Sequence, residues 1–387
     1  MRILFASSSS GSRGGGELFL LYLAEALARR GHELALWVAS HERMDELAEK
    51  FSRFGHVQRA FYHNTYDHHL RLLATCLNFS TSFRVALQWR KWKPDVLHIN
   101  KQNLEDGLDL LRAGVGSGLP SICTIHITQT ARFLKARIPA VRDFLSKHAL
   151  ARYKGALVAV NETRGKELTR FLGGRRANIF AVPNGAQIQS RNSLQPVRAG
   201  KRVDLAINEK QKLVLGLGRM VAQKRPWIFL SLAEQINRQV PDARFLWVGD
   251  GDWASQWDEM VAKRKLGSFV RRISWQVEPL PFLAAGDLFL HTAEFEGLPF
   301  ALLEAMAAHL PCAIPVQLAK ELAIQDSGGI LPAEDVPGLV TALQDDARLN
   351  AVAENGNRLI QQKFSVERMA ERYEELYRQA LSAHSAH

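Results

Sequence analysis

The chain has 387 residues, of which 47% are hydrophobic, and its 50 Lys and Arg exceed its 39 Asp and Glu, which gives a formal net charge of +11. This length exceeds what one hydrophobic core usually supports, so we expect two domains, and the hydrophobic fraction excludes a disordered chain. The cysteines Cys76, Cys123 and Cys312 form no CxxC pair, which excludes a disulfide framework and a cysteine zinc site.

No segment is expected to cross a membrane. The longest run without charged residues, 113–131, contains Pro120, three glycines and His126, which a bilayer-spanning helix does not accommodate together. The apolar stretch at the N-terminus covers only residues 3–6, so it lacks the hydrophobic region of a signal peptide. We therefore expect the protein in the cytoplasm, either free or attached to the inner face of the cytoplasmic membrane.

Residues 1–190 predict an α/β domain. The segment opens with a strand, a Gly-rich turn, a helix and a second strand, which together form a βαβ unit. Strands alternate with helix-length stretches, which is typical of a parallel sheet covered by helices. The predicted strands are 2–7, 33–39, 96–100, 121–127 and 156–161.

Residues 191–208 are polar and show no hydrophobic period, which predicts an interdomain linker. A second α/β domain is predicted over 209–365. Its strands are expected at 212–218, 244–250, 270–275, 287–292 and 311–315. The segment 366–387 closes the chain with an amphipathic helix, in which Met369, Tyr373, Leu376 and Ala380 recur at helical spacing. The sequence thus predicts two doubly wound, Rossmann-like domains.

Ligands of parallel sheets bind at the carboxyl ends of the strands, so residues that directly follow strands are candidates for a site. Gly15 and Gly16 follow the first strand, where glycine lets the backbone approach a phosphate closely. An ordinary glycine turn is the alternative. The dinucleotide fingerprint GxGxxG does not fit, because Phe19 stands where it requires Gly or Ala, and a nicotinamide-dependent dehydrogenase is disfavoured.

A basic loop follows the first strand of the second domain. It contains Gly218, Arg219 and Lys224. A guanidinium and an ammonium group five residues apart are suited to hold a diphosphate. A solvated basic loop without function is the alternative.

A third candidate lies between the strand 287–292 and the helix after it. Gly297, Leu298 and Pro299 predict a tight entry into that helix. Glu296 lies just before the first turn of this helix and Glu304 lies within the helix. This spacing favours separate hydrogen-bonding roles over an acid and base pair. A surface helix with two glutamates is the alternative.

His126 ends a strand of the first domain, where a structural, hydrogen-bonded histidine is the alternative to a catalytic one. Asp250-Gly251-Asp252 has the DxD form that holds a divalent metal in some sugar transferases. The same three residues are equally typical of a turn.

Together these motifs resemble the family-4 retaining glycosyltransferases of GT-B fold, over most of the chain and in the right order. The Gly-rich loop and helix 13–34, the V-P-N-G of 182–185, GLGRMVAQK, VGDG and the E-x7-E pair Glu296 and Glu304 all match. The resemblance implies two Rossmann-like domains that face a cleft and a last helix that crosses back to the first domain.

The resemblance also implies roles for individual residues. Arg219 and Lys224 would bind the donor diphosphate, Glu296 the transferred sugar, and Glu304 the ribose hydroxyls, while His126 would lie near the sugar and the acceptor. The remaining donor-binding positions would be Gly15, Gly16, Asn184, Gly218, Gly297, Leu298 and Pro299. The donor is expected to be a nucleoside-diphosphate sugar, with no metal or other cofactor, and the anomeric configuration is expected to be retained. Arg225, His309 and 316–319 depart from the pattern, in which glycines are usual.

The expected acceptor is a lipid-linked or cell-surface glycan, as in lipopolysaccharide, capsule or exopolysaccharide biosynthesis. Two alternatives are a GT-B enzyme that epimerises or hydrolyses nucleotide sugars, and a basic protein that binds polyanions. Residues 1–200 carry a net charge of +14 and residues 201–387 one of −3. No nucleic-acid-binding motif accompanies this charge, so no nucleic acid partner is expected. The basic and aromatic segments 89–93 and 130–154 suit either an anionic membrane surface or an ordinary solvated face.

Overall fold

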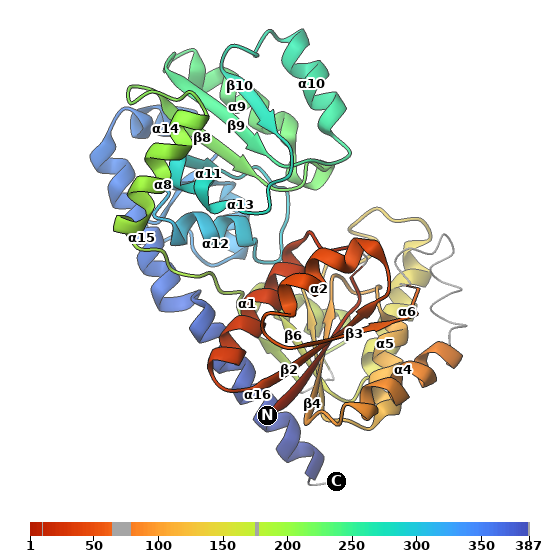
Figure 1. The fold of residues 1–387 in the computed structure, drawn as a ribbon. Helices are drawn as coiled ribbons and strands as arrows, with labels where there is room; N and C mark the ends of the chain where they lie inside the picture. Colours follow the sequence, from red (N-terminus) through yellow and green to blue (C-terminus); the bar gives the residue numbers. More distant parts are fainter. Residues whose placement is uncertain (10, 64–78, 175–177, 386–387) are drawn as a thin grey trace. The chain divides into compact units, whose positions relative to one another are not determined.

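The computed structural model describes residues 1–9, 11–63, 79–174 and 178–385. The chain folds into two compact units (Figure 1). Unit 1 comprises Met1–Gly185 together with Val366–His387, and unit 2 comprises Ala186–Ser365. Each unit is a parallel sheet with helices on both faces, and the last helix belongs to unit 1, so the α/β fold with a returning helix is confirmed.

The sheet of unit 1 has seven parallel strands in the order β3-β2-β1-β4-β5-β6-β7. The strands predicted in this unit all form, and two that were not predicted lie at the two edges of the sheet. β3 is a half-exposed edge strand, so it lacks the continuous hydrophobic run of a central parallel strand. The strands are β1 (Arg2–Ser7), β2 (Glu33–Ala39), β3 (His56–Ala60), β4 (Val96–Lys101), β5 (Ser121–Ile125), β6 (Ala156–Ala159) and β7 (Ile179–Ala181).

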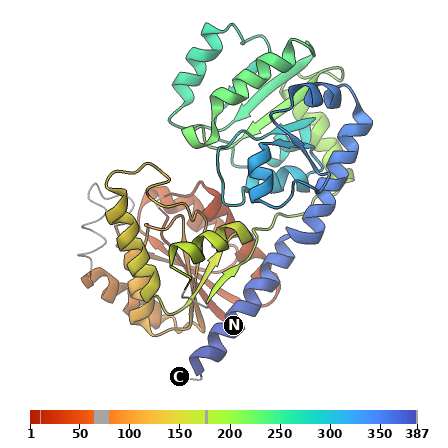
Figure 2. The same ribbon diagram turned by 180° about the vertical axis from the view of Figure 1, so that it is seen from behind.

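Helices cover both faces of this sheet. The first two and the last one lie on the face seen in Figure 1, and α6 and α7 lie on the face seen in Figure 2. Local signals set several helix ends: Pro139 opens α6, and the Asn161 side chain caps α7 by accepting from the Arg164 amide. The described helices are α1 (Gly15–Arg29), η1 (Glu42–Met44), α2 (Asp45–Phe51), α4 (Phe79–Lys91), α5 (Leu108–Ser117), α6 (Pro139–Arg152), α7 (Glu162–Phe171) and α16 (Val366–Ser385).

Helix α16 is fastened to unit 1 by buried polar contacts. The Tyr377 hydroxyl lies 2.8 Å from Nδ1 of His98, whose Nε2 lies 2.8 Å from the Thr124 hydroxyl. Burial lowers the pKa of His98 to about 3, so this histidine is a neutral core group and not a second candidate base. Glu374 accepts hydrogen bonds from Arg30 at 2.9 and 3.0 Å, and this contact lowers its pKa to about 2.

Unit 2 has six parallel strands in the order β10-β9-β8-β11-β12-β13. Its hydrophobic core packs between the sheet and helices such as α9 and α14. The strands are β8 (Lys212–Leu217), β9 (Ala243–Val248), β10 (Val270–Ile273), β11 (Leu288–Leu290), β12 (Cys312–Ile314) and β13 (Ile330–Pro332). The helices are α8 (Arg191–Asp204), η3 (Ala222–Lys224), α9 (Pro226–Asn237), α10 (Ala254–Lys263), α11 (Leu280–Ala285), α12 (Phe300–Ala307), α13 (Val316–Glu321), α14 (Val336–Leu343) and α15 (Asp346–Lys363).

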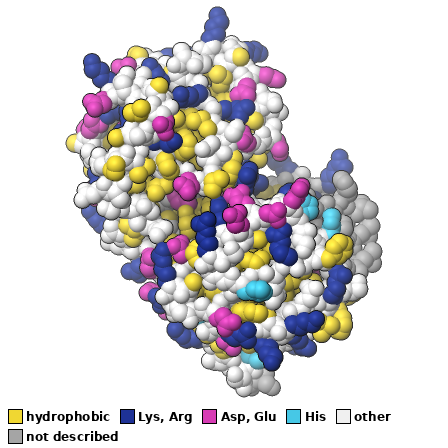
Figure 3. Space-filling model, viewed as in Figure 1, with side chains coloured by type: hydrophobic (Ala, Val, Ile, Leu, Met, Phe, Trp, Pro, Cys, Tyr) yellow, Lys and Arg dark blue, Asp and Glu magenta, His cyan; other side chains and the backbone are white. Residues whose placement is uncertain are grey.

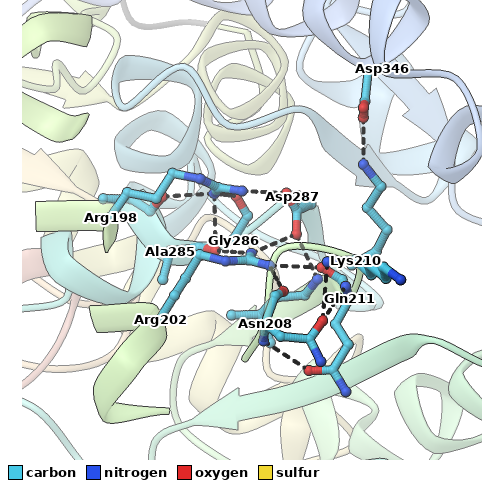
Figure 4. Close-up of polar contacts among 12 residues, drawn as sticks. Arg198, Arg202, Asn208, Lys210, Gln211, Ala285, Gly286, Asp287 and Asp346 are labelled. Carbon is cyan, nitrogen blue, oxygen red and sulfur yellow. Dashed lines mark hydrogen bonds and ion pairs between the residues drawn. The ribbon is translucent and has the colours of Figure 1, made fainter. Parts of the chain in front are cut away.

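The predicted linker 191–208 is wrong, because most of it forms α8, which is part of unit 2. Figure 4 shows Arg198 and Arg202 of this helix directed at Asp287, to which they donate at 2.5 and 2.9 Å. Arg202 also donates to the Asn208 and Gln211 carbonyls, both at 2.7 Å. The helix has few apolar residues, so its sequence looks like a linker, although Leu194 is buried and the distant Asp287 holds two of its arginines.

The segment 89–93 also differs from the sequence interpretation. Trp89 is fully buried and packs edge-on against Trp37, with ring centroids 5.6 Å apart, so it is a core residue of unit 1. Trp92 is half-buried beneath the Arg2 guanidinium. The exposed aromatic residues of α4 lie elsewhere on the helix, at Phe79 and Phe83.

The described residues contain no helix long and apolar enough to cross a membrane. Cys123 and Cys312 are buried and form no disulfide with a described residue, and Cys76 lies outside the described residues. Burial raises the pKa of Cys312 well above its usual range.

Candidate functional site

The loop that leaves β8 is shaped by glycines. Gly218 and Gly249 both adopt φ of +137°, a region that favours glycine, and a Cβ on Gly249 would lie 2.2 Å from the Gly218 carbonyl oxygen. The Met220 amide donates to the Asp250 carbonyl at 2.8 Å, which holds the turn 248–252 against this loop. The Asp250 carboxylate accepts from Arg272 and from the Trp275 amide. The DxD segment is therefore a structural turn, and no metal-binding cluster of His, Cys, Asp or Glu occurs in the described ranges.

The two cations of this loop have different surroundings. Arg219 is exposed and forms no ion pair with a described residue, so its guanidinium is accessible to a ligand. Lys224 is in η3 and forms an ion pair with Glu296, with 16% of the lysine side chain and 11% of the glutamate side chain exposed. The structure thus brings Lys224 and Glu296, which are 72 residues apart in sequence, into direct contact.

Backbone contacts join this loop to the one that follows β11. The Thr292 hydroxyl donates to the Lys224 carbonyl at 2.7 Å, and the Gln223 side chain donates to the Phe295 carbonyl at 2.8 Å. Arg225 donates to the Thr292 carbonyl at 2.8 Å and to the Ala293 carbonyl at 3.2 Å. The contacts between the two loops therefore fix the positions of Lys224 and Glu296 relative to each other.

Two of the departures from the family pattern occupy backbone positions that favour glycine. Arg225 has φ of 48° and His309 has φ of 55°, which costs a residue with a side chain roughly 1–2 kcal/mol. Each side chain makes hydrogen bonds that offset this cost: Arg225 bonds the β11 loop, and His309 lies 3.2 Å from the Gln189 carbonyl and 3.3 Å from Arg191. The missing glycines are thus replaced by anchoring side chains.

The segment after Glu296 leads into α12. Glu296 to Pro299 are buried, and Pro299 is the N-cap of the helix, with φ of −75°. Glu304 lies within α12 and is half-buried, so a ligand can reach its carboxylate. Glu296 is thus buried and Glu304 half-buried, and their separate hydrogen-bonding roles stay a prediction.

Sequence reasoning missed His291, which lies beside the ion pair. Its Nε2 is 3.7 Å from Oε1 of Glu296, and its side chain is 3% exposed. Burial and the nearby Lys224 and Arg225 hold the pKa of His291 well below its usual value, so the imidazole is neutral. A signal was available, because His291 lies near the end of the predicted strand 287–292, as His126 lies near the end of its strand.

Unit 1 brings together two of its own candidates. Asn100, at the carboxyl end of β4, donates to the Gly16 carbonyl at 3.1 Å and lies 2.8 Å from Nε2 of His126 through its side-chain oxygen. A Cβ on Gly16 would lie 2.2 Å from Nε2 of Gln102, so a larger residue there would have to displace the Gln102 side chain. Burial lowers the pKa of His126 to about 3, which makes it a neutral donor. Sequence reasoning also missed Asn100, which connects these two residues.

The remaining candidates of unit 1 are Gly15 and Asn184. Gly15 begins α1 after the N-cap Gly14, which has an extended backbone. Asn184 is 2% exposed and precedes the last residue of the first segment of unit 1. The structure thus assigns Gly15, Gly16, His126 and Asn184 to unit 1 and all other candidates to unit 2.

Comparison with known proteins agrees with this division. The family Glycosyltransferase Family 4 matches residues 13–190, and the family Glycosyl transferases group 1 matches residues 197–342. The chain is 23% identical to the UDP-Gal:alpha-D-GlcNAc-diphosphoundecaprenol alpha-1,3-galactosyltransferase of Escherichia coli, over 82% of this chain and 83% of that protein. It is 27% identical to the lipopolysaccharide core biosynthesis glycosyltransferase LpsE of Rhizobium meliloti, over 42% of this chain and 49% of that protein.

Solved structures show the same fold. Anabaena HepE, in complex with UDP and glucose, has a TM-score of 0.77 at 17% identity and covers 97% of this chain and 98% of its own. WaaG, a glycosyltransferase involved in lipopolysaccharide biosynthesis, has a TM-score of 0.70 at 16% identity and covers 97% and 99%. With both units matched in sequence and in structure, this chain belongs to the family-4 glycosyltransferases and has their GT-B fold.

Proposed function

We propose that the protein transfers a sugar from a nucleoside-diphosphate sugar to a glycan or lipid-linked acceptor and retains the anomeric configuration. The observation that carries this proposal is the Lys224–Glu296 pair, held by two joined loops beside the exposed Arg219. A cation for the diphosphate and a carboxylate for the sugar are adjacent there. The E. coli relative is named for a UDP-galactose donor and a diphosphoundecaprenol acceptor, and HepE binds UDP and glucose, which supports the same donor and acceptor classes here.

Charge stabilisation explains how such a site promotes transfer. As the bond between sugar and diphosphate breaks, negative charge develops on the leaving phosphate, and fixed cations near it stabilise the transition state. Arg219 and Lys224 supply these cations, and the N-terminus of α12 adds a positive dipole end. We propose on this basis that the enzyme is metal-independent. The acceptor attacks the anomeric carbon on the face from which the leaving group departs, and the leaving phosphate takes the acceptor proton. The anomeric configuration is then retained.

Half-exposed Glu304 would bind the ribose hydroxyls of the same donor. In unit 1 the proposed contacts are the backbone at Gly15 and Gly16 for the phosphate and the neutral His126 for the sugar and acceptor side. The close Asn100 contact fixes the His126 ring without adding charge.

A thermal-shift screen with UDP, GDP, ADP and CDP tests the proposed donor class. We expect one of them to raise the melting temperature, because a ligand at about 100 times its Kd stabilises the protein by ~2.7 kcal/mol. If no nucleoside diphosphate has an effect, but heparin stabilises the protein in a strongly salt-dependent way, the polyanion-binding alternative is correct. Turnover of the nucleotide sugar to an epimer or a free sugar at full rate without acceptor would indicate the second alternative.

The exposed basic and apolar face of unit 1 supports a proposed contact with an anionic membrane. Phe133, Ile138 and Phe144 are 54%, 62% and 66% exposed, and the cations around them include Arg132, Lys135, Arg137 and Lys147. On α4, Phe79, Phe83 and Leu87 form a second exposed stripe at helical spacing. Figure 3 shows basic and hydrophobic side chains interspersed on the part of the surface where α4 lies in Figure 1. Such surfaces bind anionic bilayers through combined burial and charge.

We expect the protein to sediment with phosphatidylglycerol vesicles and not with phosphatidylcholine vesicles. The triple variant Phe133→Ser, Ile138→Ser, Phe144→Ser should lose most of this binding, because each buried aromatic or aliphatic side chain contributes roughly 1.5–3 kcal/mol. Val203→Ser is the matched control, since Val203 is 79% exposed in unit 2. Equal sedimentation of wild type and triple variant, or no preference for anionic lipid, would contradict the membrane contact.

A further inference from the structure

The imidazole of His291 has a buried nitrogen whose hydrogen-bonding capacity is unused. His291 lies at the end of β11, its backbone amide donates to the Ala313 carbonyl at 2.8 Å, and its ring stacks on Phe289 with centroids 5.9 Å apart. These contacts fix the ring. Its Nε2 forms no hydrogen bond with any residue that the structure describes. A buried polar atom without a partner costs roughly 1–3 kcal/mol, so it calls for a functional explanation.

The nearest functional atom to this nitrogen is one carboxylate oxygen. Oε1 of Glu296 lies 3.7 Å from Nε2 of His291, which is beyond hydrogen-bond distance, and the same Oε1 receives the ammonium group of Lys224. Lysine and histidine therefore approach one oxygen from two elements, η3 and the end of β11. In the ligand-free protein the lysine has the contact.

If the protein has the function proposed above, donor binding changes which of the two residues, Lys224 or His291, contacts Glu296. If Lys224 moves to the diphosphate, Oε1 of Glu296 loses its contact with the ammonium group, and the unsatisfied Nε2–H of His291 can donate to that oxygen instead. We propose that His291 is a positioning residue that takes over Glu296: its Nε2–H donates to Oε1 when Lys224 leaves, and so keeps the carboxylate aimed at the transferred sugar. Only a small movement of either side chain closes the 3.7 Å gap.

The neutrality of the imidazole suits this role. A protonated His291 would compete with Lys224 for Glu296 in the ligand-free state and would add a second charge beside the sugar. A neutral ring can still donate one proton, and the facing carboxylate selects the tautomer with that proton on Nε2. The lysine can then bind the phosphate while Oε1 of Glu296 accepts a hydrogen bond from His291.

A stability cycle tests this inference without any nucleotide. In a Lys224→Met background His291 should already bond Glu296, so His291→Phe should lower the melting temperature there by about 2–4 °C more than it does in the wild type. His291→Gln retains an N–H donor at a similar distance from the backbone. In the Lys224→Met background it should therefore leave the melting temperature unchanged. Equal effects of His291→Phe in both backgrounds would overturn the inference, whatever the protein binds.

A binding measurement tests the same inference in the donor complex, with UDP and UDP-glucose as probes. His291→Phe should keep the Kd for UDP within about twofold of the wild-type value. It should weaken the binding of UDP-glucose roughly tenfold, because only the sugar contacts Glu296. His291→Gln should restore the affinity for UDP-glucose. In a Glu296→Gln background, His291→Phe should cause no further loss of affinity for either probe.

Two other outcomes of this measurement are decisive. Equal losses for both probes would show a general structural role of His291 and contradict the inference. If the wild type binds neither probe, the donor has another base, the proposed function is judged by the thermal-shift screen, and the stability cycle decides the role of His291.

Discussion

Lys224→Met is expected to reduce sugar transfer by about 10²–10³-fold, which is the usual loss when a preorganised group facing developing charge is removed. The methionine keeps most of the side-chain volume, so the loops around η3 should remain packed. Two losses combine in this variant: the leaving phosphate loses a cation, and Glu296 loses its ion pair with Lys224. The measurement is the initial rate of transfer from the nucleotide sugar identified by the thermal-shift screen, together with the Kd of the matching nucleoside diphosphate.

Glu296→Gln should reduce the rate to a similar extent and leave the affinity for the nucleoside diphosphate nearly unchanged, because the carboxylate is proposed to act on the sugar. Lys263→Met is the matched control, since Lys263 is an exposed lysine of α10 that makes no ion pair with a described residue. A Lys224→Met protein with the wild-type rate would remove the basis of the proposed function. Equal losses in the control would show that the effect is one of net charge alone.

Asp287→Ala is expected to destabilise unit 2 by about 3–5 kcal/mol, which is typical when one member of a buried ion pair is removed. The side chain of Asp287 is 12% exposed and accepts from Arg198, from Arg202 and from the Leu213 amide at the start of β8. Its removal leaves the Arg202 guanidinium, which is 10% exposed, without a carboxylate. The unit 2 transition in scanning calorimetry should fall by at least ~6 °C.

Asp204→Ala is the control for this prediction. Asp204 lies on the same helix, α8, and pairs with Lys201 at 2.9 Å, but its side chain is 63% exposed. An exposed pair of this kind contributes roughly 0–1 kcal/mol, so the melting temperature should change little. If Asp287→Ala behaves like Asp204→Ala, then the backbone carbonyls that Arg198 and Arg202 also contact are sufficient to hold α8.

The polar helix α8 illustrates why some elements could not be predicted. Residues 191–208 contain few apolar residues, of which Leu194 and Leu205 are buried, and Pro196 lies inside the helix. The helix forms because Arg198 and Arg202, one turn apart, reach an aspartate that lies more than 80 residues further along the chain. Hydrophobic periodicity reports burial of apolar side chains and contains no information about such a distant charge.

In the segment 89–93, the sequence suggested a surface where the structure has a core residue. Tryptophans among Arg and Lys are typical of an interfacial surface, but helix phase turns Trp89 inward to Trp37, while Phe79, Phe83 and Leu87 face outward. The orientation of each side chain came from packing. In the segment 130–154, Phe133, Ile138 and Phe144 are exposed, and the membrane contact of this segment stays a prediction.

The sequence by itself determined the two α/β units, most of the central strands, and the candidate positions after strands. It could do so because buried parallel strands are continuous apolar runs and because ligands of such sheets bind where these runs end. The tertiary structure alone decided which candidates meet. It paired Lys224 with Glu296, placed His291 beside the same oxygen, joined His126 to Gly16 through Asn100, and made the DxD segment a turn. Apart from His291 and Glu296, which are close in sequence, these contacts connect residues distant along the chain, and only the folded sheets bring them together.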